Sequence, residues 1–177
     1  MTESPLAQMT MRGKWAEGIE PRHFHWIVKD RLAICERPGG YGAQHRRVRR
    51  MEEIIWIRQH EFDWVLSLID ANHNLHNYDE QNLPYLHRPV VLGDGAEASL
   101  ALSYEELHTL LEAGKLVLAH HEELGDRLCG FVAGYLVWSG LIDAAPRAIT
   151  VVEQITSRQL GPVGRQIVTI AAELQPG

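Results

Sequence analysis

Cysteine is scarce in the 177-residue sequence, which holds only Cys35 and Cys129. The two lie far apart and lack metal-ligand spacing, which argues against a disulfide framework or a cysteine-based zinc site. Long apolar runs are missing too, since none approaches the ~18–20 residues that span a bilayer. The first fifteen residues lack the basic and then apolar order of a signal peptide. We therefore expect a cytoplasmic protein that does not use a membrane.

Positive charge is in deficit, because the formal net charge is −6. A general nucleic-acid binder needs a dominant basic face, so we expect no nucleic-acid partner. The hydrophobic content of 45% and the charged content of 23% are those of an ordinary globular protein, and the length suits one core. Residues 1–20 are polar and carry Gly and Pro, which predicts a flexible arm before a single domain at residues 21–177.

Strands and helices alternate in the hydrophobic pattern. Apolar, β-prone runs predict strands at residues 24–28, 32–35, 64–69, 85–92 and 115–120. Helical spacing and start signals predict helices at residues 48–59, 103–113, 127–139 and 146–156, and one beginning near residue 162. Ser103 is the expected start of the second helix because Glu106 completes a capping box, and Pro89 should break its strand or place it at a sheet edge. This order predicts an α/β fold with a central mixed or mainly parallel sheet flanked by helices.

The predicted strand, turn and helix at residues 115–139 form a recurring kind of anion site. A helix N-terminus directs unsatisfied N–H groups and the positive end of its dipole into such a turn. Arg127 stands at the start of this helix, where a guanidinium can close on a phosphate with two hydrogen bonds.

Residues 115–142 read KLVLAHHEELGDRLCGFVAGYLVWSGLI. This stretch resembles the strand, phosphate loop and helix of cysteine-dependent protein tyrosine and dual-specificity phosphatases, whose pattern is His-Cys, five residues, then Arg. RLAICERPGG, LHRPVVLGDG and, as in bacterial members, SRQLGPVGRQIV extend the resemblance over roughly residues 24–170. The resemblance implies a phosphotyrosine-phosphatase-like fold, with His120 as the family histidine, Arg127 as the phosphate-binding arginine and Asp94 as the general acid.

The sequence departs from the family pattern at the reactive position, where His121 replaces the nucleophilic cysteine. The family glycine is replaced by Leu124, with Gly125 displaced by one residue, and the Ser or Thr after the arginine is Leu128. The loop that results comprises His120, His121, Glu122, Glu123, Leu124, Gly125, Asp126 and Arg127.

Thiolate chemistry is excluded, because neither cysteine can take the place of the nucleophile. Cys129 falls within the predicted helix, and Cys35 is expected in a strand on the other side of the domain. The three acids Glu122, Glu123 and Asp126 also oppose a bound dianion. Each unit-charge repulsion at ~4 Å costs about 1–4 kcal/mol.

Two functions follow. The first is a pseudophosphatase, a binding or regulatory module in which Arg127 pairs with Glu122, Glu123 or Asp126. The second is an active phosphoester hydrolase. There His121 is the nucleophile, Arg127 the clamp and Asp94 the acid, or Glu122 or Glu123 activates water as a general base. Asp94 has a plainer interpretation as a residue of an ordinary Gly-Asp-Gly turn.

A third possibility is a metal held by His120 and His121, with Glu122, Glu123 or His87. Adjacent residues rarely ligate one ion, so we predict neither a metal nor a cofactor.

The cluster His45-Arg-Arg-Val-Arg-Arg50 is the one strongly basic segment. It is either a solvated face complemented by Glu52 and Glu53, or a site for a phosphorylated or acidic partner or a small phosphoester.

Overall fold

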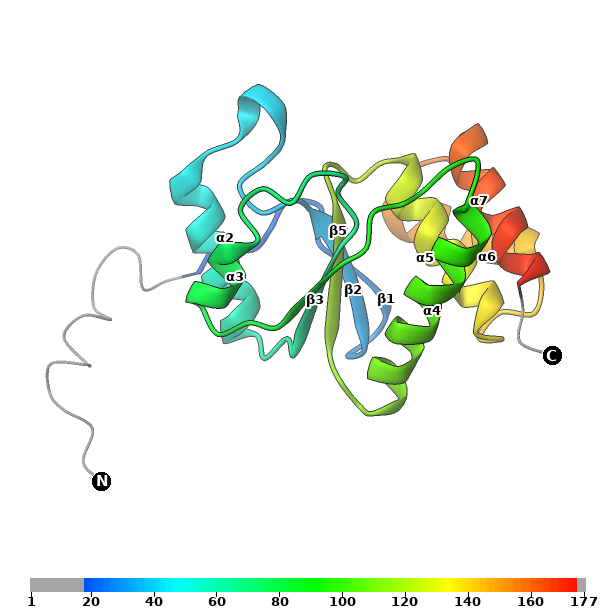
Figure 1. The fold of residues 1–177 in the computed structure, drawn as a ribbon, viewed down its shortest axis with the longest axis horizontal. Helices are drawn as coiled ribbons and strands as arrows, with labels where there is room; N and C mark the ends of the chain where they lie inside the picture. The colour runs from blue at the N-terminus through cyan, green and yellow to red at the C-terminus, as the bar shows by residue number, and fades with distance from the viewer. Residues whose placement is uncertain (1–17, 175–177) are drawn as a thin grey trace, which may run out of the picture.

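The computed structural model describes residues 18–174 and has one sheet between two layers of helices (Figure 1). The strands are β1 (His25–Val28), β2 (Leu32–Glu36), β3 (Trp64–Ser67), β4 (Tyr85–His87) and β5 (Val117–His121). The helices are η1 (Gly42–Gln44), α2 (Arg47–Gln59), α3 (His76–Glu80), α4 (Ala96–Glu112), α5 (Asp126–Trp138), α6 (Ala145–Thr156) and α7 (Pro162–Glu173).

The five strands follow the order β1-β2-β5-β3-β4. β1 pairs with β2 in the antiparallel sense, and all the other pairs are parallel. This confirms the predicted mixed, mainly parallel sheet. Because β2, β3, β4 and β5 run in the same direction, the loops that follow them meet at one edge of the sheet. Ligands of open α/β sheets bind at this edge.

Each face of the sheet has its own core. α2 and α3 cover one face, where Ile54 and Ile57 lie in one cluster with Val65 and Leu118 (Figure 1). α4 to α7 cover the other face, where every residue of α5 from 128 to 138 is buried. The sequence predicted a central buried helix here because its residues are apolar on all sides, and the burial of α5 confirms this prediction.

The close approach of α5 and α7 depends on glycine. A Cβ atom built on Gly130 would lie 2.5 Å from the Cα of Gly164, which is far inside any real contact. The two backbones therefore touch where the side chains of other residues would hold them apart. This contact fixes α7 beside the first turns of α5.

Several predicted boundaries differ from the structure, and three of them bear on the site. α4 begins at Ala96, well before Ser103, because the apolar face continues upstream through the buried Leu100. The Ser103 hydroxyl donates to the carbonyl of Ser99 at 3.0 Å and caps nothing. β4 ends at His87, since Pro89 lacks an N–H, and it lies at the sheet edge. β5 extends to His121, so this residue ends the strand.

The predicted N-terminal arm at residues 1–20 falls mainly on residues 1–17, which lie outside the described part, as do residues 175–177. Residues 18–20 run along α2. There the Ile19 N–H donates to the carbonyl of Glu52 at 3.1 Å, and the Gly18 N–H donates to Oε1 of Gln59 at 3.2 Å. Within residues 18–174, no helix has the length and apolar content to cross a membrane.

Candidate functional site

The candidate site is the loop that joins β5 to α5, together with the residues that face it. β5 lies between β2 and β3, with Glu36 opposite His121 and Ser67 opposite His120. Gly125 precedes α5 in an extended conformation and provides no side-chain cap. The first N–H groups of α5 therefore have no partner within the helix, and they open onto the loop.

His121 is half-buried at the end of β5, and within residues 18–174 its buried Nε2 has no hydrogen-bond partner. Burial and the nearby Arg127 lower the pKa of His121, while Asp70, Glu122 and Glu123 act in the opposite direction. The net shift is downward from 6.5, so the imidazole is neutral at pH 7. Because the His121 imidazole is neutral, the positive charge at this point of the site comes from Arg127.

An open depression of about 240 Å³ lies beside His121. Its lining residues are His121, Glu123, Gly125, Asp126, Arg127 and Val163. The depression therefore combines loop residues with α7, which the glycine contact holds next to α5.

Arg127 forms an ion pair with Asp70, with 3.6 Å between Nη1 and Oδ2. The predicted pairing of Arg127 with a loop acid is therefore wrong. Asp70 follows β3, the strand next to β5, and the parallel arrangement brings the two strand ends together. An exposed ion pair of this kind is worth ~0–1 kcal/mol, so it leaves Arg127 available to an anion.

Asp126 caps another helix. Its carboxylate oxygens accept the N–H groups of Gly161 at 2.7 Å and of Gly164 at 2.8 Å, at the N-terminus of α7. Negative charge at a helix N-terminus is favourable. One of the three loop acids thus has a structural role that the sequence did not indicate.

The two loop glutamates are engaged by the β2–α2 loop, which spans residues 37–46. The Arg37 Nη1 lies 3.1 Å from Oε2 of Glu122. The Tyr41 hydroxyl hydrogen-bonds with Glu123, and this bond raises the pKa of Tyr41. Both glutamates therefore have partners outside the loop, which reduces the repulsion expected from the sequence.

His120 lies beneath the loop and is fully buried. Its Nε2 is 3.0 Å from the hydroxyl of Tyr78 on α3, and the two form a hydrogen bond. Burial lowers the pKa of His120 to about 3, so the ring is neutral. His120 braces the loop from below, as a strand-end histidine commonly does.

Cys35 is closer to the site than predicted. β2 is the direct neighbour of β5, and Cys35 lies opposite His120, so its predicted place on the other side of the domain is wrong. The thiol is nevertheless inaccessible, with an exposed fraction of 0% for Cys35 and 2% for Cys129. Burial raises the pKa of both thiols. Neither sulfur is a nucleophile in the folded protein.

Both thiols of the native protein should resist Ellman's reagent. We expect no release of thionitrobenzoate at pH 8 before unfolding, and two equivalents in guanidinium, because buried thiols of raised pKa supply almost no thiolate. Rapid reaction of one equivalent in the native state would contradict the burial of Cys35 and Cys129.

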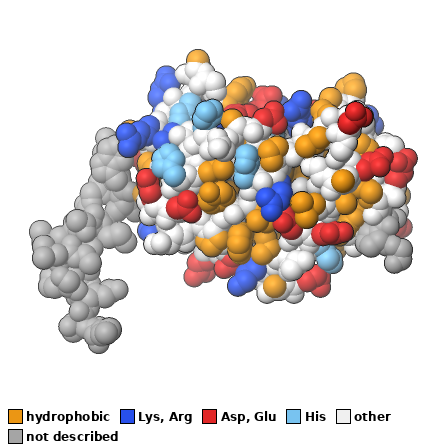
Figure 2. Space-filling view, in the orientation of Figure 1, with side chains coloured by type: hydrophobic (Ala, Val, Ile, Leu, Met, Phe, Trp, Pro, Cys, Tyr) orange, Lys and Arg blue, Asp and Glu red, His pale blue; other side chains and the backbone are white. Residues whose placement is uncertain are grey.

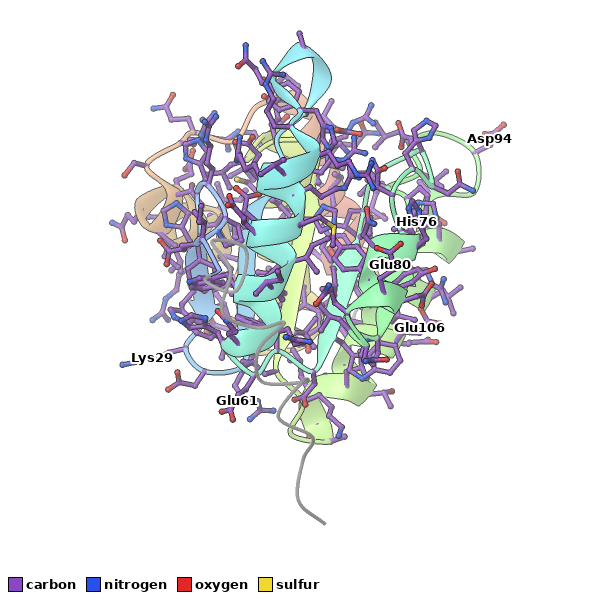
Figure 3. The ribbon with its side chains drawn as sticks, turned by 90° about the vertical axis from the view of Figure 1, so that its left-hand side faces the viewer. Lys29, Glu61, His76, Glu80, Asp94 and Glu106 are labelled. Carbon is purple, nitrogen blue, oxygen red and sulfur yellow. The ribbon has the colours of Figure 1, made fainter. Side chains whose placement is uncertain are left out.

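Asp94 lies at the tip of the loop before α4 and points outward (Figure 3). It is exposed and lines a separate depression with Gln166 and Ile170. It is not among the residues that line the depression beside His121. Its role as a general acid stays a prediction.

His87 does not join the loop histidines, because its Nε2 lies 2.7 Å from the carbonyl of Ile69. In the described part of the chain, no group of three or more His, Cys, Asp or Glu residues is arranged to hold a metal ion.

Asp70, Arg37 and Tyr41 are the site residues that the sequence did not reveal. Only Asp70 carried a signal, since it follows a buried strand.

Comparisons with known proteins identify the fold. No protein-family model and no curated protein sequence matches the chain. Among solved structures, the kinase associated phosphatase with its catalytic cysteine changed to serine has a TM-score of 0.72 and 18% identity, over 87% of this chain and 96% of that one.

Two further structures agree. Tk-PTP in its active form has a TM-score of 0.67 and 16% identity, over 86% of this chain and 96% of that one. Human DUSP28 has a TM-score of 0.65 and 12% identity, over 89% and 97%. The chain therefore has the fold of protein tyrosine and dual-specificity phosphatases, which confirms the fold that the sequence resemblance implied.

Proposed function

We propose that this protein is a pseudophosphatase, a catalytically inactive phosphatase-like protein that acts as a binding or regulatory module. The observation that carries the proposal is His121, which ends β5 where the phosphatase pattern has its nucleophilic cysteine. The cytoplasmic location expected from the sequence stays a prediction.

Cysteine phosphatases require a low-pKa thiolate that attacks phosphorus and leaves as a thiolate. Here the two thiols are buried and have raised pKa values, and Leu128 stands where a hydroxyl residue assists the leaving sulfur. Two requirements of that reaction are therefore unmet, an accessible low-pKa thiolate and the hydroxyl residue after the arginine. This supports the loss of activity more strongly than one substitution would.

Anion binding, by contrast, has support in the loop. The first-turn N–H groups of α5 are open, and Arg127 is held only by an exposed ion pair. Within residues 18–174, the backbone N–H groups of Glu123 and Leu124 donate to no backbone carbonyl. Donors and a cation thus remain where the family resemblance places a phosphate.

The test is turnover and binding measured side by side on the full chain. We expect no hydrolysis of p-nitrophenyl phosphate above buffer between pH 5 and 8, because no thiolate forms. We expect weak binding of inorganic phosphate by ³¹P NMR, reduced about tenfold in Arg127→Ala because a charge-assisted hydrogen bond is lost. Arg147→Ala on the exposed face of α6 is the matched control. Turnover that His121→Ala abolishes would overturn the proposal.

A second candidate is a phosphoester hydrolase that uses His121, and the neutral imidazole beside Arg127 favours it. An imidazole nitrogen would attack phosphorus as the ester P–O bond breaks, and the leaving oxygen would take a proton from the general acid, with Asp94 as the predicted donor. Water, activated by Glu122 or Glu123, would then hydrolyse the N–P bond. Acid-labile phosphate trapped on His121 would establish this function, and its absence during measured turnover would exclude it.

A further inference from the structure

The β2–α2 loop and the first turn of α2 carry an unusual concentration of cations. Residues 37–51 contain five arginines and no Asp or Glu, in a protein whose net charge is −6. Figure 2 shows blue and pale-blue side chains gathered at the upper left, over this end of α2. We call His45, Arg46, Arg47 and Arg50, with the neighbouring Tyr41 and Val48, the arginine surface.

Two arginines of the segment are neutralised and belong to the fold. Arg37 pairs with Glu122, and Arg49 pairs with Glu53, with 2.6 Å between Nε and Oε1. The other oxygen of Glu53 accepts the N–H of Gly39 at 2.6 Å. These contacts brace the loop and place the arginine surface beside the β5–α5 loop.

The remaining three arginines form no ion pair with a carboxylate in the described part of the chain. Arg50 has an exposed fraction of only 7%, and its hydrogen-bond partners are neutral: Oδ1 of Asn77 at 2.8 Å and Nε2 of His45 at 3.0 Å. Arg46 donates to the carbonyls of Ala43 and His45. A nearly buried guanidinium without a carboxylate is costly unless another anion approaches.

The helix adds to this positive charge. α2 has no acidic residue in its first turn, and its N-cap Arg46 makes no side-chain capping bond. Cations here oppose the helix dipole, and the open N–H groups attract the same kind of ligand as the arginines. Local stability alone gives no reason for this arrangement, whereas anion recognition does.

Apolar side chains flank the charges. Tyr41 and Val48 have exposed fractions of 41% and 47%. Arginine and tyrosine are the residues most often found at the energetic centres of protein interfaces. A surface on which guanidinium groups without carboxylate partners lie near exposed apolar groups suits a peptide that carries acidic side chains.

We infer that the arginine surface is a docking site for an acidic or phosphorylated segment of a partner protein. The inference goes beyond the proposed function and rests on it only where the surface adjoins the β5–α5 loop through Arg37 and Glu122. A long nucleic acid is disfavoured because Glu36 and Glu122 lie against Arg49 and Arg37 next to the surface, and the protein as a whole is acidic.

The test is fluorescence anisotropy of the full chain with a fluorescein-labelled decaglutamate peptide at low and physiological salt. We expect binding that weakens as salt rises, and a loss of about tenfold in affinity for Arg46→Glu/Arg47→Glu. Both positions are exposed, so the variant should keep the thermal unfolding temperature of the parent within a few degrees.

The matched control is Lys115→Glu/Arg147→Glu, which makes the same change in net charge at exposed positions just before β5 and on α6. It should retain the parent affinity. Equal losses in both variants would mean unspecific attraction and would overturn the inference, as would absence of peptide binding at low salt. Binding to phosphatidylserine vesicles instead of the peptide, lost in Arg46→Glu/Arg47→Glu, would assign the surface to a membrane. Measured phosphatase turnover would contradict the proposed function, but it would not change the peptide affinity by which the docking site is tested.

Discussion

Lowering the pH from about 6.5 to about 3 is expected to cost the native state up to about 4–5 kcal/mol through His120 alone. The folded pKa is lowered to about 3 from 6.5, so the unfolded chain binds a proton in this window and the native chain does not. Stability is therefore fully present above the unfolded pKa and falls as the pH drops, by about 1.4 kcal/mol per unit. Protonation would also make both ring nitrogens donors, so the Tyr78 hydroxyl could then only accept from Nε2.

Urea unfolding measured at several pH values between 7 and 4 provides the check. In the His120→Gln variant, the free energy of unfolding should fall less steeply with decreasing pH below 6.5, by about 1.4 kcal/mol per pH unit. Its stability at pH 7 should fall because the hydrogen bond to Tyr78 is weakened. His60→Gln, which removes an exposed imidazole at the end of α2, is the matched control. A pH slope that is the same in His120→Gln and the parent would contradict the burial of a neutral His120.

The second large effect is expected from Gly130→Ala. In an isolated helix this change would stabilise by about 1 kcal/mol, because alanine is the better helix former. In this protein the new Cβ would meet the Cα of Gly164 at 2.5 Å and its carbonyl oxygen at 2.8 Å. These are backbone atoms that cannot rotate away, so α5 and α7 must separate. We expect a net loss of about 2–3 kcal/mol in the free energy of unfolding.

The Gly114→Ala variant measures the cost of backbone strain without a steric clash, so it is the control for Gly130→Ala. Gly114 has open space around its Cβ position but a φ of +76°, so alanine should cost only about 1 kcal/mol there, and Gly114→Asn less. Chemical denaturation of the three variants and the parent would rank them. If Gly130→Ala were as stable as the parent, the backbone contact between α5 and α7 would be wrong.

The strands and helices followed from the sequence where local pattern decides them. The apolar run of α5, the prolines that open α6 and α7, and the buried β3 and β5 were all predicted, because each depends on residues within one element. The start of α4 was misplaced because a capping box is a weak signal, and Ser103 lies on a continuing apolar face. The order of residues in the β5–α5 loop was equally plain, including His121 and Arg127.

The partners of those loop residues were decided by tertiary structure alone. Arg37 and Glu122 are 85 residues apart, and Asp126 lies 35 residues from Gly161, so no local pattern pairs them. The sequence suggested three free acids around an arginine. In the fold, Asp126 caps α7, Glu122 pairs with Arg37 and Glu123 hydrogen-bonds with Tyr41. Arg127 pairs with Asp70.

What the sequence by itself determined is the α/β fold and its phosphatase-like order of elements, and it predicted His121 at the position of the family cysteine. Only the tertiary structure decided that Cys35 lies beside His120 yet is buried, and that Arg37 of the β2–α2 loop contacts Glu122 of the candidate site. The physical reason is the parallel sheet. It gathers the ends of strands that are remote in sequence at one edge, where charge, burial and pairing are set by neighbours that the linear order does not reveal.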